Sequence, residues 1–258
     1  MIRAVLPVLA LSLAVTIAVG PARAEMKKEW IEYSQGDTKL KGYFIYDDKV
    51  TGKHPAVLMI HDRAGMSDTA LQHAEIWAKL GYPTFAADIY GFGQGVLPKT
   101  VPEMEAQTDI YTHNHPLMRA RTQAGFDTLA KNPLVDASKI ALIGYCFGGA
   151  VGLEFSSTGA PLAANVAIHG SFRDRDADWA KNVKGMYLIL HGADDMGYPL
   201  TTVNGVINDL RAAKVPFELE VYSGTGHGFS TPKNPAEERA NAESIATTAR
   251  TLKQIFGI

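Results

Sequence analysis

A single cysteine, Cys146, lies in a glycine-rich stretch whose spacing is typical of a nucleophile held on a sharp turn. Residues 140–153 read IALIGYCFGGAVGL, so that glycines flank the cysteine two residues away on either side. The apolar residues before it predict a buried strand, and the small residues after it predict the start of a helix. This is the strand–turn–helix pattern of a nucleophile elbow, with cysteine in place of the more usual serine. The N-terminus of that helix carries the positive end of the helix dipole, which would favour the thiolate form of Cys146.

A free cysteine on its own is more often a small buried hydrophobic side chain. The glycines change that interpretation, because a side chain at the flanking positions of such a turn would collide with the neighbouring strand or helix. We therefore interpret Cys146 as a nucleophile.

The base and acid that a cysteine nucleophile needs are found downstream, each after a predicted strand. Residues 186–195, MYLILHGADD, form a strand that leads into an acidic loop, so that the acid is Asp194 or Asp195. Residues 217–221 form the next strand, and the glycine-rich loop after it contains His227. The order nucleophile, acid, histidine is that of hydrolases built on this kind of elbow. His227 is accordingly the candidate general base.

These loops need a framework of alternating strands and helices. Besides the strands named above, buried or paired strands are predicted at residues 30–34, 40–46, 56–60, 84–87, 140–143 and 165–168. Apolar residues at helical spacing predict helices at residues 68–80, 115–132, 201–213 and 235–256. The alternation indicates a single α/β domain with a mostly parallel sheet and helices on both faces.

The segment of residues 91–116 interrupts this alternation, since it is long and rich in glycine and proline. It follows a strand, so we expect it to border the ligand crevice, with one short helix at residues 102–111. The alternative interpretation is that this segment is a surface excursion with the same short helix. Its two histidines, His113 and His115, have no third histidine or carboxylate at a metal-binding spacing, and no metal site is predicted.

Composition excludes several classes of protein. The chain has 258 residues, of which 46% are hydrophobic, and this is enough for a substantial core. Its formal net charge of −2 gives no basic surface for nucleic acid. One cysteine permits neither an internal disulfide nor a cysteine-based metal cluster.

Residues 1–24 resemble a secretory signal peptide. A short basic start is followed by an apolar run and by PARA, which places small residues where signal peptidase cleaves. The apolar run is short for a membrane span. We expect cleavage before Glu25, no stable membrane insertion of the mature domain at residues 25–258, and a periplasmic or secreted location.

The motifs GYCFGG, HGADD, GHGF and ADIYG together resemble the dienelactone hydrolase family of the α/β-hydrolase fold. The resemblance implies a triad of Cys146, Asp195 and His227, with Asp195 chosen over Asp194 by the G-x-x-D spacing. It also implies an oxyanion hole formed by the backbone N–H groups of Arg63 and Phe147. Asp88, in the ADIYG stretch, is interpreted as a loop-forming residue.

Two departures from the family pattern concern the substrate and the resting thiol. Family members commonly carry glutamate where this chain has Asp62, a candidate for controlling the thiol or, alternatively, a turn residue. Dienelactone-cleaving members hold a substrate carboxylate with arginines after the ADIYG stretch and after the catalytic histidine. This chain has Phe92 and residues 230–232 there, and Arg63 or Arg173 would have to substitute.

The resemblance implies hydrolysis of a small-molecule ester or lactone through a thioester, without a cofactor. Tyr90, Phe92 and Tyr145 are candidate pocket walls. Thioesterase or amidase activity on the same triad, and a non-catalytic binding protein on a hydrolase scaffold, are the alternatives. A thiol redox protein would need a second, resolving cysteine, which the sequence lacks.

Overall fold

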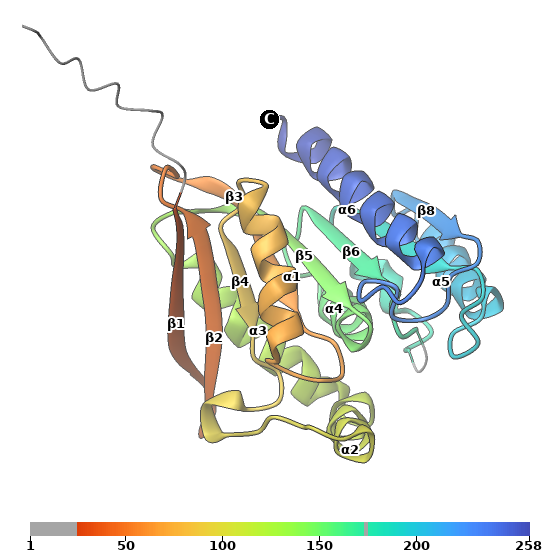
Figure 1. The fold of residues 1–258 in the computed structure, drawn as a ribbon, viewed down its shortest axis with the longest axis horizontal. Helices are drawn as coiled ribbons and strands as arrows, with labels where there is room; N and C mark the ends of the chain where they lie inside the picture. Colours follow the sequence, from red (N-terminus) through yellow and green to blue (C-terminus); the bar gives the residue numbers. More distant parts are fainter. Residues whose placement is uncertain (1–24, 173–174) are drawn as a thin grey trace, which may run out of the picture.

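Eight strands form one sheet in the order β1-β2-β4-β3-β5-β6-β7-β8. The structure is a computed structural model and describes residues 25–172 and 175–258 (Figure 1). Pairing is antiparallel between β1 and β2 and between β2 and β4, and parallel across the other strands. The strands are β1 (Met26–Gln35), β2 (Thr38–Asp47), β3 (His54–Ile60), β4 (Thr84–Ala87), β5 (Val135–Tyr145), β6 (Ala164–Ile168), β7 (Met186–Gly192) and β8 (Phe217–Tyr222).

Helices cover both faces of this sheet. Helices α1 and α6 lie on one face and α3, α4 and α5 on the other, while α2 extends from one end of the molecule (Figure 1). The helices are α1 (Asp68–Lys79), α2 (Val101–Thr112), α3 (His115–Ala130), α4 (Phe147–Ser157), α5 (Leu200–Ala212) and α6 (Pro235–Phe256), with short 3₁₀ turns η1 (Phe92–Gln94) and η2 (Trp179–Asn182).

The two-sided covering follows from the composition of the central strands. On β7, Leu188 and Leu190 pack in the cluster that contains α6, whereas Tyr187 and Ile189 pack in the cluster that contains α5. Successive side chains of a strand point to opposite faces, so a continuous apolar run must be buried on both. The short apolar runs of the sequence are therefore central parallel strands.

Local signals in the sequence set the ends of the helices. The Thr100 side chain accepts a hydrogen bond from the Glu103 N–H while the Glu103 carboxylate accepts one from Thr100, which is a capping box at the start of α2. Asn234 caps α6, and Gly257 ends it with a φ of 70° in the left-handed region.

The structure confirms the predicted fold class and the predicted helix inside the segment of residues 91–116. The predicted strands are generally shorter than the observed ones, because their ends carry polar residues; β5, for example, begins at Val135 rather than at residue 140. The expected signal peptide at residues 1–24 lies outside the described residues. Within the described part of the chain, no helix combines the length and apolarity needed to cross a membrane.

Candidate functional site

Cys146 lies at the tip of the turn between β5 and α4. Its backbone has a φ of 51° and a ψ of −113°, a left-handed conformation that is uncommon for a residue other than glycine. A Cβ atom on Gly144 would lie 2.0 Å from the Gly148 carbonyl oxygen, and one on Gly148 would lie 2.5 Å from the Ile60 carbonyl oxygen. The flanking glycines are thus required by close backbone contacts, as the sequence pattern predicted.

The structure brings the three predicted triad residues into direct contact. The Nε2 atom of His227 lies 3.0 Å from the Sγ atom of Cys146, and its Nδ1 atom lies 2.7 Å from Oδ2 of Asp195. Their loops follow β5, β7 and β8, which are parallel and therefore end at the same edge of the sheet. One ring nitrogen faces the thiol while the other is held by a carboxylate.

Asp195, rather than Asp194, contacts the histidine. Its Oδ1 atom accepts hydrogen bonds from the backbone N–H groups of Gly197 at 3.0 Å and Tyr198 at 2.9 Å, which leaves Oδ2 for His227. Asp195 is buried and Asp194 is exposed. The loop therefore orients one carboxylate and releases the other to solvent.

The electrostatics of the triad favour a charged pair. Burial by itself lowers the pKa of His227, but its hydrogen bonds to Asp195 and Cys146 outweigh burial and raise that pKa to about 9. Burial raises the pKa of Asp195, but hydrogen bonds from His227 and Tyr198 outweigh it, and the net direction is downward. At neutral pH the imidazole is therefore favoured as imidazolium.

Two residues after β6, which the sequence analysis did not single out, complete the surroundings of the thiol. The Ser171 Oγ atom lies 3.8 Å from the Cys146 Sγ atom. The ring of His169 packs edge-to-face on His227, with the ring centroids 5.1 Å apart, and its Nε2 atom lies 2.7 Å from Ser230 Oγ. Burial, and next the charge of His227, keep the pKa of His169 well below its usual value. Their position at the carboxyl end of a parallel strand is the signal that could have found them.

The proposed oxyanion residues lie beside the thiol. Arg63 and Phe147 both line the cavity that contains Cys146. Phe147 is the first residue of α4, where a backbone N–H has no partner within the helix. The loop that carries Arg63 is fixed by neighbours: the Tyr90 hydroxyl donates to the Arg63 carbonyl at 3.3 Å, and His61 Nδ1 lies 2.7 Å from the Asp62 carbonyl.

Asp62 forms the alternative contact that the sequence left open. Its Oδ1 atom accepts a hydrogen bond from the Ala64 N–H at 2.8 Å, which is a turn within its own loop. Asp62 also lines the cavity, but in the described residues the thiol contacts His227 and Ser171 and has no hydrogen bond to Asp62.

Asp88 has the loop-forming role that the sequence analysis assigned to it. Its carboxylate accepts hydrogen bonds from the backbone N–H groups of Lys41, Gly91 and Gly93. This carboxylate joins the segment after β4 to β2, and Asp88 is not among the residues that line the cavity of the thiol.

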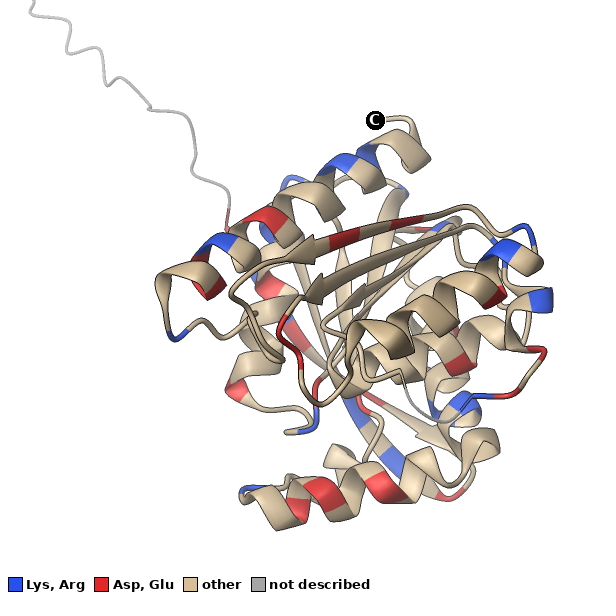
Figure 2. Cartoon of the chain, turned by 90° about the vertical axis from the view of Figure 1, so that its right-hand side faces the viewer, with Lys and Arg blue, Asp and Glu red and all other residues tan. Residues whose placement is uncertain are grey.

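The thiol opens into a polar cavity of about 900 Å³. Helix α2 forms one wall of it, which confirms that the segment of residues 91–116 borders the crevice, and Figure 2 shows acidic positions along this lowest helix. The charged lining side chains are Asp62, Arg63, Glu105, Asp109, Glu154 and Lys233. Carboxylates therefore outnumber cations. Arg173, a suggested substitute anchor, lies outside the described residues.

The three aromatic residues suggested as pocket walls do not line this cavity. Tyr145 points to the other side of the sheet, where its hydroxyl accepts a hydrogen bond from Trp77 Nε1 at 3.2 Å. Phe92 stacks on Trp30 of β1, with ring centroids 5.3 Å apart. Tyr90 is buried behind Arg63. These aromatic side chains pack in the core or against β1 instead, so the prediction that they form walls of the pocket was wrong.

The chain is similar to known proteins over most of its length. Residues 40–256 match the model of the dienelactone hydrolase family. A Yersinia pestis protein assigned as a carboxymethylenebutenolidase is 26% identical over 231 residues, which cover 81% of each chain.

Solved structures with the same fold were also found. A dienelactone hydrolase-like promiscuous phosphotriesterase from metagenomic libraries is 30% identical, with a TM-score of 0.83 over 90% of this chain and 99% of that one. A Klebsiella pneumoniae protein assigned as a dienelactone hydrolase has a TM-score of 0.77 at 20% identity, covering 89% of this chain and 99% of the other, and this likeness concerns the fold alone.

Proposed function

Since this chain belongs to the dienelactone hydrolase family and is a hydrolase of ester or lactone bonds, we propose that it works through a cysteine nucleophile and a thioester intermediate. Cys146 is the nucleophile, His227 the acid–base group and Asp195 the residue that orients the imidazole. The observation that carries the proposal is the unbroken contact from Asp195 through His227 to the Cys146 sulfur.

In the first half of the reaction, the Cys146 thiolate attacks the carbonyl carbon, and the carbonyl electrons move onto oxygen. The N–H groups of Arg63 and Phe147 stabilise that oxyanion, an interaction worth a few kcal/mol per donor in related sites. The tetrahedral adduct then collapses, the carbon–oxygen bond of the ester breaks, and His227 Nε2 gives its proton to the leaving alkoxide. The acyl group remains on sulfur as a thioester.

In the second half, neutral His227 takes a proton from water, and the resulting hydroxide attacks the thioester carbonyl. Collapse expels the Cys146 thiolate and releases the carboxylic acid product. His227 again becomes imidazolium, so the resting ion pair is restored and atoms and charge balance. Asp195 keeps Nε2, and not Nδ1, facing the sulfur throughout.

Hydrolysis of p-nitrophenyl acetate by the purified chain tests this proposal. We expect Cys146→Ala and His227→Ala to reduce kcat/KM at least about 1000-fold, as for other members of such triads. The matched pair is Asp195→Asn against Asp194→Asn, since only Asp195 contacts His227; the first should lose activity and the second should keep it. A stalled reaction should carry one acetyl group on Cys146 by mass spectrometry.

Retained activity in Cys146→Ala would refute the cysteine mechanism. Hydrolysis of thioesters or anilides faster than of the matched oxygen esters would support the thioesterase or amidase alternative on the same triad. Absence of any hydrolysis, together with binding of the ester, would indicate the non-catalytic alternative.

We also propose that the protein acts in the periplasm or outside the cell. The support is the sequence pattern of residues 1–24, with its basic start, apolar run and small residues before Glu25. Fractionation of expressing cells tests the location, because recovery of the protein only from the cytoplasm would contradict it.

A further inference from the structure

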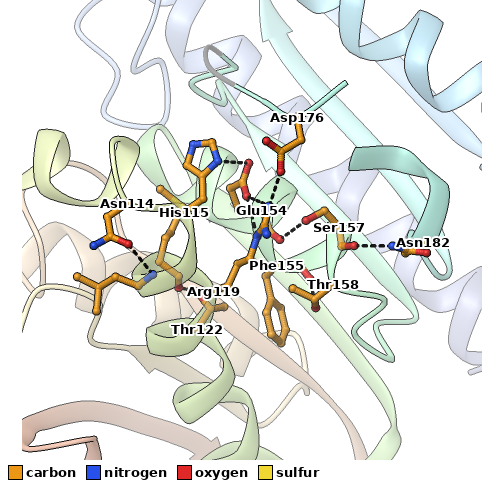
Figure 3. Close-up of polar contacts among 12 residues, drawn as sticks. Asn114, His115, Arg119, Thr122, Glu154, Phe155, Ser157, Thr158, Asp176 and Asn182 are labelled. Atoms are coloured by element: carbon orange, nitrogen blue, oxygen red, sulfur yellow. Dashed lines mark hydrogen bonds and ion pairs between the residues drawn. The ribbon is translucent and has the colours of Figure 1, made fainter. Parts of the chain in front are cut away.

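Four charged or titratable side chains from three separate segments meet beside the cavity, and two of them, His115 and Glu154, line it. His115 is the first residue of α3, Arg119 lies one turn further on, Glu154 belongs to α4, and Asp176 follows β6 (Figure 3). An Nη2 atom of Arg119 lies 2.7 Å from Oε2 of Glu154 and 2.9 Å from Oδ2 of Asp176. The sequence analysis saw no carboxylate near His115, because both acids come from distant parts of the chain.

Glu154 is the unusual member of this group. Its side chain is 2% exposed, whereas the other buried residues of α4 are apolar or small. Its Oε2 atom is bound by Arg119, but its Oε1 atom has no hydrogen-bond donor in the described residues. Oε1 has an ion-pair contact with Nδ1 of His115, at 3.4 Å (Figure 3). A buried carboxylate oxygen without a hydrogen bond is costly, so Oε1 has the capacity to bind a further partner.

The charges of the group indicate that this partner is a cation. One guanidinium, that of Arg119, faces two carboxylates, those of Glu154 and Asp176. These three side chains together carry a net charge of −1, and one of the two carboxylates, that of Glu154, is buried. Burial of a carboxylate that is not fully compensated is unfavourable, so a positive ion in contact with Oε1 would stabilise the arrangement.

We propose that His115, Glu154 and Asp176 bind a divalent transition-metal ion. One donor atom from each of the three lies within 4.8 Å of the others, a spacing that a small adjustment of the exposed Asp176 side chain would bring to metal-ligand geometry. One imidazole nitrogen and two carboxylate oxygens form a donor set used for Zn²⁺ and for neighbouring first-row ions.

Arg119 fits this site as an outer partner of the ligands. It binds Oε2 of Glu154 and Oδ2 of Asp176, so the second oxygen of each carboxylate is left for the ion. Ligating carboxylates are ordinarily held in this way by hydrogen bonds from a second layer of residues. His115 and Glu154 also line the cavity that contains Cys146, so the remaining coordination positions of the ion would face the cavity.

Titration of the purified chain with Zn²⁺ and Co²⁺ tests this site, and Cys146→Ala is the background because a thiolate beside His227 would itself attract metal. Calorimetry should show one ion per chain. Bound Co²⁺ should show the visible absorption of nitrogen and oxygen ligation. We expect Glu154→Gln and His115→Ala each to weaken binding at least tenfold, comparable to or beyond the loss of an outer-layer partner.

His113→Ala is the matched control, since its Nδ1 atom faces the Asp109 carbonyl at 2.9 Å, outside the group, and it should leave the affinity unchanged. Should Glu154→Gln fail to fold, His115→Ala and Asp176→Asn, whose side chains are part-exposed and exposed, give the same test with circular dichroism as the folding control. Equal affinity in all variants, or no binding, would overturn the proposal. An ordered water would then be the simplest partner for Oε1 of Glu154. The readout is metal binding, so it is independent of ester hydrolysis.

Discussion

The Nε2 atom of His227 lies 3.0 Å from the Sγ atom of Cys146, although 81 residues separate them in the sequence. The contact depends on two constraints that the fold imposes separately. The elbow holds Cys146 in a left-handed backbone conformation at the end of β5, and the Asp195 carboxylate fixes the other ring nitrogen of His227 at the end of β8. Neither side chain is therefore free to turn away from the other.

The first prediction concerns the reactivity of this thiol. Iodoacetamide should alkylate Cys146 and abolish ester hydrolysis in parallel, because the proposed nucleophile lines the cavity and lies next to the base His227. Mass spectrometry and residual activity, followed over the same time course, check this. Full activity in a chain that is completely alkylated would contradict a cysteine nucleophile. Cys146→Ser should be much less active, since the base must then deprotonate a far weaker acid.

The second prediction concerns pH. The pKa of His227 is raised to about 9, so the protonated imidazole, which must give a proton to the leaving group, is present below that pH and is lost above it. We therefore expect kcat/KM for a neutral ester to fall as the pH rises through about 9. A pH–rate profile measures this limb.

The cause of the raised pKa can be tested separately. Cys146 supplies both a hydrogen bond and a charge that raise the pKa of His227, so the pKa should be lower in Cys146→Ala. Imidazole NMR signals, followed against pH in both chains, measure the change. The buried His73, whose Nε2 atom lies 3.5 Å from the Ser230 carbonyl oxygen, serves as the internal control. An unchanged titration of His227 would show that the thiol does not determine its protonation.

The third prediction concerns the elbow. In Gly149→Ala the added Cβ atom would lie 2.5 Å from the Gly170 Cα, and backbone cannot move aside as a flexible side chain does. We expect a loss of about 2 kcal/mol or more in the free energy of unfolding, which is roughly 4–8 °C in Tm for a domain of this size. Gly226→Ala is the control, since its nearest neighbour would be 3.8 Å away. Equal stability of the two variants would contradict the steric requirement at Gly149.

The fold could be predicted from local signals because its central strands are short apolar runs and its helices carry clear caps. The run over residues 56–60 becomes the fully buried end of β3, and Pro235 begins α6 as the sequence indicated. The ends of the strands could not be predicted in the same way. Whether the mostly polar residues 136–139 belong to a strand depends on the pairing of Val135 with His54, which the sequence does not specify.

The triad was predictable for a different reason from the cavity walls. Parallel strands place their carboxyl ends at one edge, so a residue after each strand is positioned by topology alone. Cavity walls depend instead on which way a side chain points across a sheet. Tyr145 adjoins Cys146 but points to the opposite face, and Glu154 reaches the cavity from a helix whose other buried residues are apolar or small.

The fourth prediction concerns the N-terminus. We expect the exported protein to begin at Glu25, because small residues occupy both positions before the expected cleavage site. N-terminal sequencing of protein recovered from the periplasmic fraction decides this. A cell-associated form that retains residues 1–24 would support a membrane anchor in place of a cleaved signal.

The last prediction concerns the charge of the substrate. Four carboxylates and two cations line the cavity, and none of its cationic residues stands at the positions where dienelactone-cleaving members hold a substrate carboxylate. A buried anion without a cationic partner is unfavourable. Arg63 and Lys233 would attract a substrate carboxylate, but the carboxylates of Glu105 and Asp109 on α2 would repel it. We therefore expect neutral esters or lactones to react with a higher kcat/KM than carboxylated lactones of similar size.

One missing charge-assisted hydrogen bond, about 1.5–3 kcal/mol, corresponds to roughly a 10- to 150-fold preference for the neutral substrate. Steady-state kinetics on a carboxylated lactone and its methyl ester measure it, with EDTA present so that no metal ion at Glu154 supplies the positive charge. Arg63→Gln, which keeps the backbone N–H, tests whether the Arg63 side chain anchors the substrate carboxylate. If the carboxylated lactone is preferred tenfold in the parent chain and this preference disappears in Arg63→Gln, then Arg63 anchors the substrate and the expected order of substrates is wrong.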